Sequence, residues 1–199
     1  TLERTAYPLV LTPHNLIPRL SGPIALPPGS YLLLIRAHGF IDLRLPIRVA
    51  PTDDERSSVA RVVPAPMLEE GTLPSGFVWI PPTQARLGGD PDAVPHREAT
   101  VVHVDGFAIA RREVSVGEWA RSRTDGVASD RHLEPAGRMY FRDARRYVDW
   151  LNGRPPPERP DGWAFDLPTY DEWELAGRGA DERWFPWGNQ FDHALCLGK

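Results

Sequence analysis

Proline constrains this chain more than any other residue, because it occurs 22 times among 199 residues. Each proline fixes its own φ angle and lacks the backbone N–H that helices and sheets use. The chain is therefore predicted to contain many turns and short strands and few long helices. Seven tryptophans need large apolar pockets, so we also expect a compact core. The apolar share of 41% is typical of a soluble globular protein and excludes a disordered chain.

Charge and cysteine content limit the partners and the compartment. The net charge is −4 with both signs interspersed, so no nucleic-acid partner is predicted. No apolar run approaches the ~20 residues that span a membrane, and we predict no membrane insertion by this chain. Cys196 is the only cysteine, which excludes an internal disulfide. A cytoplasmic location is the expectation that follows.

The first 66 residues are predicted to form a small β-sandwich domain. Residues 41–49 alternate apolar with polar residues or proline, the pattern of a strand with one buried face. Pro46 within that run indicates an edge strand. Residues 31–35 are a short apolar strand entered through a Pro-Pro-Gly-Ser turn, and 58–63 are predicted to be a third strand. Residues 67–74, bracketed by prolines, are predicted to be a linker.

A mixed α+β domain is predicted over residues 75–199. Its strands are expected at 77–80, 100–104 and 107–109. Ser115 with Glu118 predicts a capping box that opens a short helix through Trp119. Apolar residues at helical spacing predict a second helix that ends at Asn152-Gly153. Thr169 with Glu172 predicts a third helix, ended by Gly177 or Gly179.

Several segments of this second domain, taken in order, resemble one family. Residues 76–82 (GFVWIPP) are similar to its opening strand, and 104–115 (VDGFAIARREVS) to its F-x-I-x-x-x-E-V-T segment. Residues 143–151 (DARRYVDWL) resemble its D-A-x-x-Y-x-x-W-L helix. Residues 167–179 (LPTYDEWELAGRG) and the Phe-Pro-Trp-Gly turn at 185–188 complete the set. The family is that of formylglycine-generating enzyme, or sulfatase-modifying factor (FGE-sulfatase).

The resemblance implies a C-type-lectin-like fold, of which this chain carries the N-terminal half. In the oxidases of the family, two cysteines of the C-terminal half bind copper and turn over the substrate cysteine. Cys196 lies in the wrong part of the pattern to be either of them. Family members also hold calcium, but residues 193–196 offer no hard side-chain oxygen where one such site would begin. We therefore predict no cofactor in this chain, with copper or calcium expected only in a full-length family member.

The first domain resembles the PEGA-like β domains of bacterial proteins. The residues that carry the likeness are 26–31 (LPPGSY), 39–40 (GF) and 46–49 (PIRV). A PEGA-like domain followed by a sulfatase-modifying-factor domain is similar to the C-terminal part of certain bacterial serine/threonine kinases. This order implies a kinase domain upstream of Thr1, since residues 1–199 themselves contain no glycine-rich phosphate loop.

No catalytic, cofactor-binding or metal residue is predicted, although several sets of residues invite such a role. Asp90 and Asp92 could hold a cation but are interpreted as a solvated turn. Glu172 and Glu174 do not face each other on a helix, so they are not a paired acid and base. The six histidines show no ligand spacing and are interpreted as surface or satisfied residues: His14, His38, His96, His103, His132 and His193.

The tryptophans could form an aromatic surface for a ligand or could simply be core. Trp119, Trp150 and Trp173 have apolar neighbours at helical spacing and are predicted to be core. Trp184 and Trp187 lie in a loop and are also predicted to be core, less firmly fixed by the pattern.

Three functions remain open. The first is a non-catalytic binding or sensory module that takes a protein or peptide ligand. The second is part of a formylglycine-generating oxidase that acts on a sulfatase cysteine, with its catalytic cysteines beyond residue 199. A diversified display protein of the same fold is a third. Two closely spaced cysteines encoded after Lys199 would favour the oxidase.

A copper titration tests the sequence argument directly. Soft thiolate ligands are needed in pairs for tight copper binding, and this chain has one cysteine. We expect no stoichiometric, tight copper binding when the 199-residue protein is titrated and followed by calorimetry. Tight binding of one equivalent would contradict the prediction.

Overall fold

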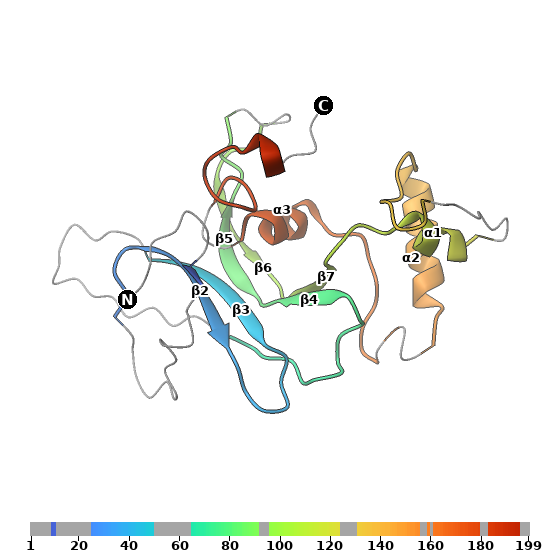
Figure 1. Ribbon diagram of the computed structural model, residues 1–199, viewed down its shortest axis with the longest axis horizontal. Coiled ribbons are helices and arrows are strands. Elements are labelled where there is room, and N and C mark those ends of the chain that lie inside the picture. The colour runs from blue at the N-terminus through green and yellow to red at the C-terminus, as the bar shows by residue number, and fades with distance from the viewer. Residues whose placement is uncertain are drawn as a thin grey trace. The chain divides into compact units, whose positions relative to one another are not determined.

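The computed structural model describes residues 9–10, 25–49, 65–91, 96–123, 131–155, 159, 161–179 and 183–195. Its strands are β1 (Leu9–Val10), β2 (Gly29–Ile35), β3 (Leu43–Val49), β4 (Phe77–Ile80), β5 (Thr83–Leu87), β6 (Thr100–Val104) and β7 (Phe107–Ala110). Its helices are α1 (Val116–Arg121), α2 (Phe141–Asn152), α3 (Tyr170–Arg178) and the 3-10 helix η2 (His193–Leu195). The mixture of short helices and small sheets confirms the predicted α+β class (Figure 1).

The first sheet has the strand order β1-β2-β3. β2 and β3 pair antiparallel, from Gly29 opposite Val49 to Ile35 opposite Leu43. The predicted alternation is confirmed, since Leu43 and Leu45 are buried and Arg44 between them is exposed. β3 is an edge strand among the described strands, as its proline predicted. The predicted strand at 58–63 lies outside the described residues, and the sandwich stays a prediction.

The chain divides into two compact units. Unit 1 comprises residues 1–69, 80–107 and 170–199, and unit 2 comprises 70–79 and 108–169. A two-stranded sheet pairs β4 with β7. None of the helices in the described part of the chain has the length and apolar character required to cross a membrane.

Unit 1 builds a small core from the β5–β6 hairpin and α3. β5 pairs antiparallel with β6, from Thr83 opposite Val104 to Leu87 opposite Thr100. α3 lies against β5 (Figure 1). The buried side chains of this core are Ala85, Leu87, Val104 and Leu175. β5 was not predicted, because only two of its five residues are apolar and Pro81-Pro82 precedes it.

Unit 2 contains α1 and α2, which share an aromatic cluster. The ring of Tyr147 lies 5.4 Å from that of Trp119 and 5.7 Å from that of Trp150, centroid to centroid. The predicted capping box is confirmed, with Ser115 N–H donating to Glu118 Oε2 at 2.8 Å and Glu118 N–H to Ser115 Oγ at 3.2 Å. The backbone hydrogen bond from Ser115 lowers the pKa of the Glu118 carboxyl below its ordinary value. α1 is therefore held at its first turn rather than by burial alone.

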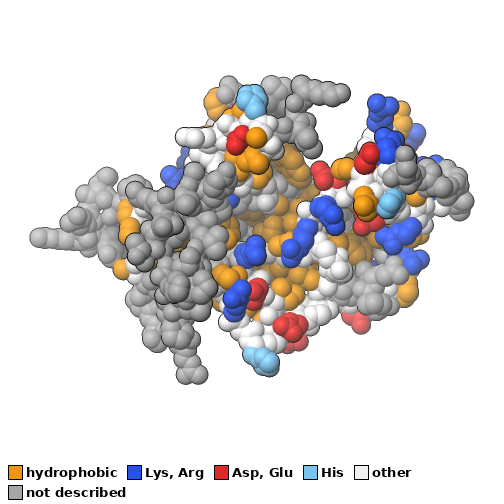
Figure 2. Space-filling view, viewed as in Figure 1, with side chains coloured by type: hydrophobic (Ala, Val, Ile, Leu, Met, Phe, Trp, Pro, Cys, Tyr) orange, Lys and Arg blue, Asp and Glu red, His pale blue; other side chains and the backbone are white. Residues whose placement is uncertain are grey.

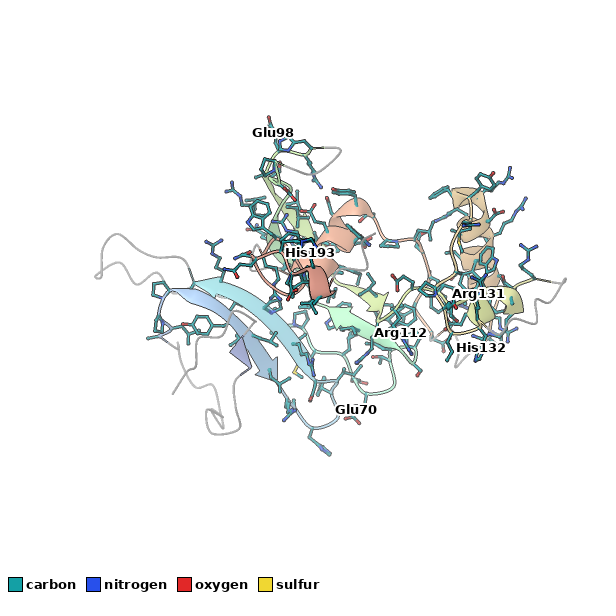
Figure 3. The ribbon with its side chains drawn as sticks, turned by 45° about the horizontal axis from the view of Figure 1, so that its top comes forward. Glu70, Glu98, Arg112, Arg131, His132 and His193 are labelled. Carbon is teal, nitrogen blue, oxygen red and sulfur yellow. The ribbon has the colours of Figure 1, made fainter. Side chains whose placement is uncertain are left out.

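Gly88 closes the β5–β6 hairpin in a conformation that only glycine adopts easily. Its φ is +76°, and a Cβ there would lie 2.5 Å from the carbonyl oxygen of Glu98. Figure 3 shows Glu98 at the outer end of this hairpin. A side chain at position 88 must therefore push two backbone segments apart.

Two glycine substitutions in unit 1 should have opposite effects. Gly88→Ala is expected to lower the free energy of unfolding by about 2 kcal/mol, through strain and the backbone clash. Gly177→Ala is expected to raise it by up to about 1 kcal/mol, because residue 177 is inside α3 with open space around it. Urea unfolding measures both, and a neutral Gly88→Ala would show that this turn is not formed.

Candidate binding groove

α3 positions the candidate site, because one of its acidic residues is buried and its two aromatic residues are exposed. The helix begins directly after Thr169, as predicted. Gly179, with φ +74°, ends it, and its N–H donates to Leu175 O at 2.7 Å. Glu174 and Leu175 are buried, whereas Trp173 is 63% exposed.

Glu174 is the centre of a buried polar cluster. Its Oε1 accepts a hydrogen bond from Gly88 N–H at 2.6 Å and another from the guanidinium of Arg178. Arg178 in turn donates to Gly88 O at 3.0 Å and to Arg183 O at 2.7 Å. The side chains of Glu174 and Arg178 are only 8% and 13% exposed, so the pair is shielded from water. The two residues hold both polar groups of the Gly88 backbone against α3.

Arg97 adds a second cation beside the same carboxylate. Its Nη1 donates to Asp171 Oδ1 at 2.5 Å and lies 3.9 Å from Glu174 Oε2. The hydrogen bond to Asp171 raises the pKa of Arg97 above its already high ordinary value, so this residue is always charged. Glu174 Oε2 is fully buried and has no hydrogen-bond partner among the described residues. Arg97 reaches this oxygen only at ion-pair distance, whereas Arg178 pairs directly with the other oxygen of the same carboxylate.

Above this cluster lies a groove of about 330 Å³, which we call the α3 groove. The volume is at the lower end of the range for ligand sites. Its lining is Gly88, Asp90, Arg97, Tyr170, Trp173, Glu174, Gly177, Arg178, Trp184, Phe185 and Pro186. In the space-filling view, hydrophobic side chains and arginines lie next to each other on the face shown (Figure 2).

The two arginines of the groove also stack on aromatic rings. The guanidinium of Arg97 lies 5.5 Å from the ring centre of Tyr170, and that of Arg178 lies 5.2 Å from the ring centre of Trp184. Tyr170 and Trp184 nevertheless stay 54% and 41% exposed. Each ring is thus fixed by a cation while part of its surface remains open to a ligand.

A tight turn presents Trp184 and Phe185 to the groove. Phe185 and Gly188 exchange backbone hydrogen bonds of 2.9 and 3.0 Å. Asn189 Oδ1 accepts from Trp184 N–H at 2.9 Å, and the rings of Phe185 and Trp187 stack at 5.3 Å. Because the turn is internally bonded, the position of its aromatic residues does not depend on a ligand.

The structure corrects the predictions for two of the tryptophans. Trp173 was predicted to be core and is exposed in the groove, because the buried face of α3 begins one residue later at Glu174. Trp119 and Trp150 are half-buried in the cluster of unit 2, which agrees with a role in packing. Trp184 is also more open than predicted, since its ring rests on Arg178 instead of an apolar pocket.

The acidic residues considered in the sequence analysis have different roles in the structure. Glu174 is the structural acid described above, and its partner in the cluster is Arg178 rather than Glu172. Asp90 lines the groove, and Asp92 lies outside the described residues. Sequence reasoning missed Gly88, Arg97 and Arg178 as groove residues. The i, i+4 spacing of Glu174 and Arg178 on a helix was the one available signal.

The described histidines do not gather into a site. His96 Nδ1 lies 2.9 Å from Asp90 O, and His103 pairs with Asp105 at 3.3 Å. His193 is on η2. The backbone carbonyl of His132 accepts a hydrogen bond from Gly117 N–H of α1 at 2.9 Å, and both histidines are labelled in Figure 3. No group of three or more His, Cys, Asp or Glu residues that could hold a metal is found in the described part of the chain. His14 and Cys196 lie outside it.

A second, smaller cavity lies among the described residues of unit 2. It measures about 60 Å³ and is lined in part by Phe77, Trp163 and Phe165. This is far below the size of a ligand site. The α3 groove is therefore the better candidate of the two.

Residues 64–195 match the FGE-sulfatase family, described as the sulfatase-modifying factor enzyme 1-like domain. The match covers more than half of the chain, and the chain belongs to this family. Comparison with curated proteins gives no match. The segments that carried the resemblance to the FGE-sulfatase family, between residues 76 and 188, all lie within the matched residues.

Glu174→Ala tests the buried cluster. The change leaves the guanidinium of Arg178 and the N–H of Gly88 without their acceptor, and we expect a loss of about 3 kcal/mol in the free energy of unfolding. Asp42→Ala is the matched control, because it breaks an exposed ion pair with Arg36 in the same unit and should cost less than about 1 kcal/mol. If urea unfolding shows equal losses in the free energy of unfolding for the two variants, Glu174 is not the centre of a stabilising cluster.

Proposed function

We propose that the chain is a non-catalytic binding or sensory module of FGE-sulfatase type and that the α3 groove receives a protein or peptide ligand. The observation that carries the proposal is a set of exposed aromatic rings in one groove, two of which are held by arginines. Trp173, Trp184 and Tyr170 line one groove, and each is 40% exposed or more. Aromatic residues supply large contact areas at low cost in conformational entropy, which suits a recognition surface.

The cluster beneath the groove supports binding over catalysis. Its carboxylate is held by Gly88 and Arg178, and its cations are held by Asp171 and Glu174. A general acid or base must exchange a proton with a substrate, and a nucleophile must reach it. Glu174 is committed to the hairpin instead. The site residues of the proposal are therefore binding residues, and it includes no cofactor in this chain.

The wider setting of the proposal comes from the sequence resemblance. We place the module after a PEGA-like β-sandwich, in a bacterial signalling protein linked to a serine/threonine kinase and located in the cytoplasm. The antiparallel β2–β3 ladder with its proline on an edge strand is compatible with such a β domain. A C-type-lectin-like fold would present the groove through its loops.

The alternative is part of a formylglycine-generating oxidase. Family membership is the observation that favours it. Under this alternative, the complete protein oxidises the cysteine of a sulfatase peptide to an aldehyde in the presence of copper and oxygen. The binding-module proposal expects that the complete protein, incubated with this peptide, copper and oxygen, forms no aldehyde. Hydrazide labelling of the peptide measures this.

Peptide selection tests the binding function without a known ligand. A displayed library of random peptides is selected on the wild-type protein and, in parallel, on Trp173→Ala. We expect peptides enriched on the wild type to bind Trp173→Ala at least about tenfold more weakly, because loss of a central aromatic contact commonly has that effect. Phe141→Ala removes a still more exposed ring, 74% against 63%, from unit 2 and should leave binding unchanged. No enriched peptide, or equal binding by the three proteins, would contradict the proposal.

A further inference from the structure

The α3 groove offers hydrogen-bond donors to a ligand. The carboxylate of Glu174 at its centre, in contrast, cannot accept a hydrogen bond from one. The indole N–H groups of Trp173 and Trp184 and the hydroxyl of Tyr170 have no acceptor within the part of the chain that the structure describes. Glu174 Oε1 is already occupied, and Glu174 Oε2 is completely buried, so neither oxygen can receive a donor from a ligand. A ligand that fits this groove therefore supplies hydrogen-bond acceptors for these groups and needs no donor for Glu174.

Charge adds a second restriction on the occupant. Arg97 is paired with Asp171, and Arg178 is paired with Glu174. Both guanidinium groups also lie over aromatic rings of the groove, so a ligand cation would compete with them for those faces. A charged ligand would therefore meet arginines whose charge is already balanced by a carboxylate. An uncharged occupant is favoured on both counts.

We propose that the α3 groove binds an uncharged, proline-rich polypeptide segment in the polyproline II conformation, which names the ligand class of the proposed function and rests on it. Proline residues have a carbonyl acceptor and no backbone N–H, which matches the unused donors of the groove. Their rings pack on aromatic faces, and Trp173 is the most exposed ring available. The polyproline II helix is already ordered before binding, so little conformational entropy is lost.

The donors and the ring faces have separable roles in this complex. Trp184 contributes a ring that Arg178 holds in place and an indole N–H that donates to a carbonyl of the segment. Replacing it with phenylalanine keeps a ring for Arg178, removes the donor and reduces the ring area. Trp173 contributes mainly open ring surface, so its removal should cost more.

Two peptides probe the ligand class. The first has three Ala-Pro-Pro repeats and the second has three Ala-Gly-Ser repeats, both with blocked ends. Titration into the 15N-labelled 199-residue protein is followed by NMR, with indole N–H signals assigned from the tryptophan variants. We expect the proline peptide to shift the Trp173 and Trp184 indole signals and to bind at least about tenfold more tightly than the second peptide.

Variants then test the assigned roles. For the proline peptide, Trp184→Phe should weaken binding about fivefold, as expected for one lost hydrogen bond, and Trp173→Ala about tenfold or more. Phe141→Ala should leave the affinity unchanged. The inference is overturned if the two peptides bind alike, if the indole signals do not move, or if Trp173→Ala binds the proline peptide as the wild type does.

The outcome of library selection separates this inference from the proposed function. If selected peptides need Trp173 but contain no proline, the groove is a binding site and a proline-rich ligand is the wrong class. If no peptide is retained, both proposals fail. A concentration-dependent dimer that Trp173→Ala abolishes would assign the groove to a second copy of the chain and would also overturn the inference.

Discussion

The carboxylate of Glu174 is the group on which the hairpin and helix of unit 1 depend. It joins α3 to the backbone of Gly88 and to the guanidinium of Arg178, and it faces Arg97 as well. A buried carboxylate is costly unless it is paired and hydrogen-bonded. Here the cost is offset by partners from two separate parts of the chain. Removing the carboxylate would leave buried groups of both parts without partners.

The groove is a consequence of this arrangement. Glu174 and Leu175 are buried, whereas Trp173 and Tyr170 remain exposed on the same helix. Arg178, held by Glu174, then supports the ring of Trp184. The polar cluster that packs α3 against the hairpin therefore also positions the aromatic surface. This link between the core and the groove is the reason that we propose binding, rather than proton transfer, as the function.

Much of the fold follows from local sequence signals. The alternation in residues 41–49, the capping box at Ser115 and the glycine at 179 each predicted an element that the structure contains. These signals depend on neighbouring residues, so they can be recognised without knowledge of the tertiary structure. β5 gave too weak an apolar pattern to be recognised, although its buried and exposed residues do alternate.

The groove could not be predicted in the same way, because it depends on contacts between residues far apart in the chain. Arg97 and Gly88 meet α3 only through the β5–β6 hairpin, about 80 residues away along the sequence. The exposure of Trp173 also depends on which face of α3 the hairpin covers. An apolar residue at helical spacing is interpreted as core unless that face is known. The family motif identified the helix and left the groove beside it unassigned.

Hydrogen exchange at the Gly88 amide tests most directly whether Glu174 holds the hairpin to α3. This N–H donates to Glu174 Oε1 and would otherwise be a loop amide. We expect it to exchange as slowly as the paired amides of the β5–β6 ladder, because exchange requires the cluster to open. Exchange at the rate of an unstructured glycine would mean that the carboxylate does not hold the hairpin to α3, and the groove would then lose its structural basis.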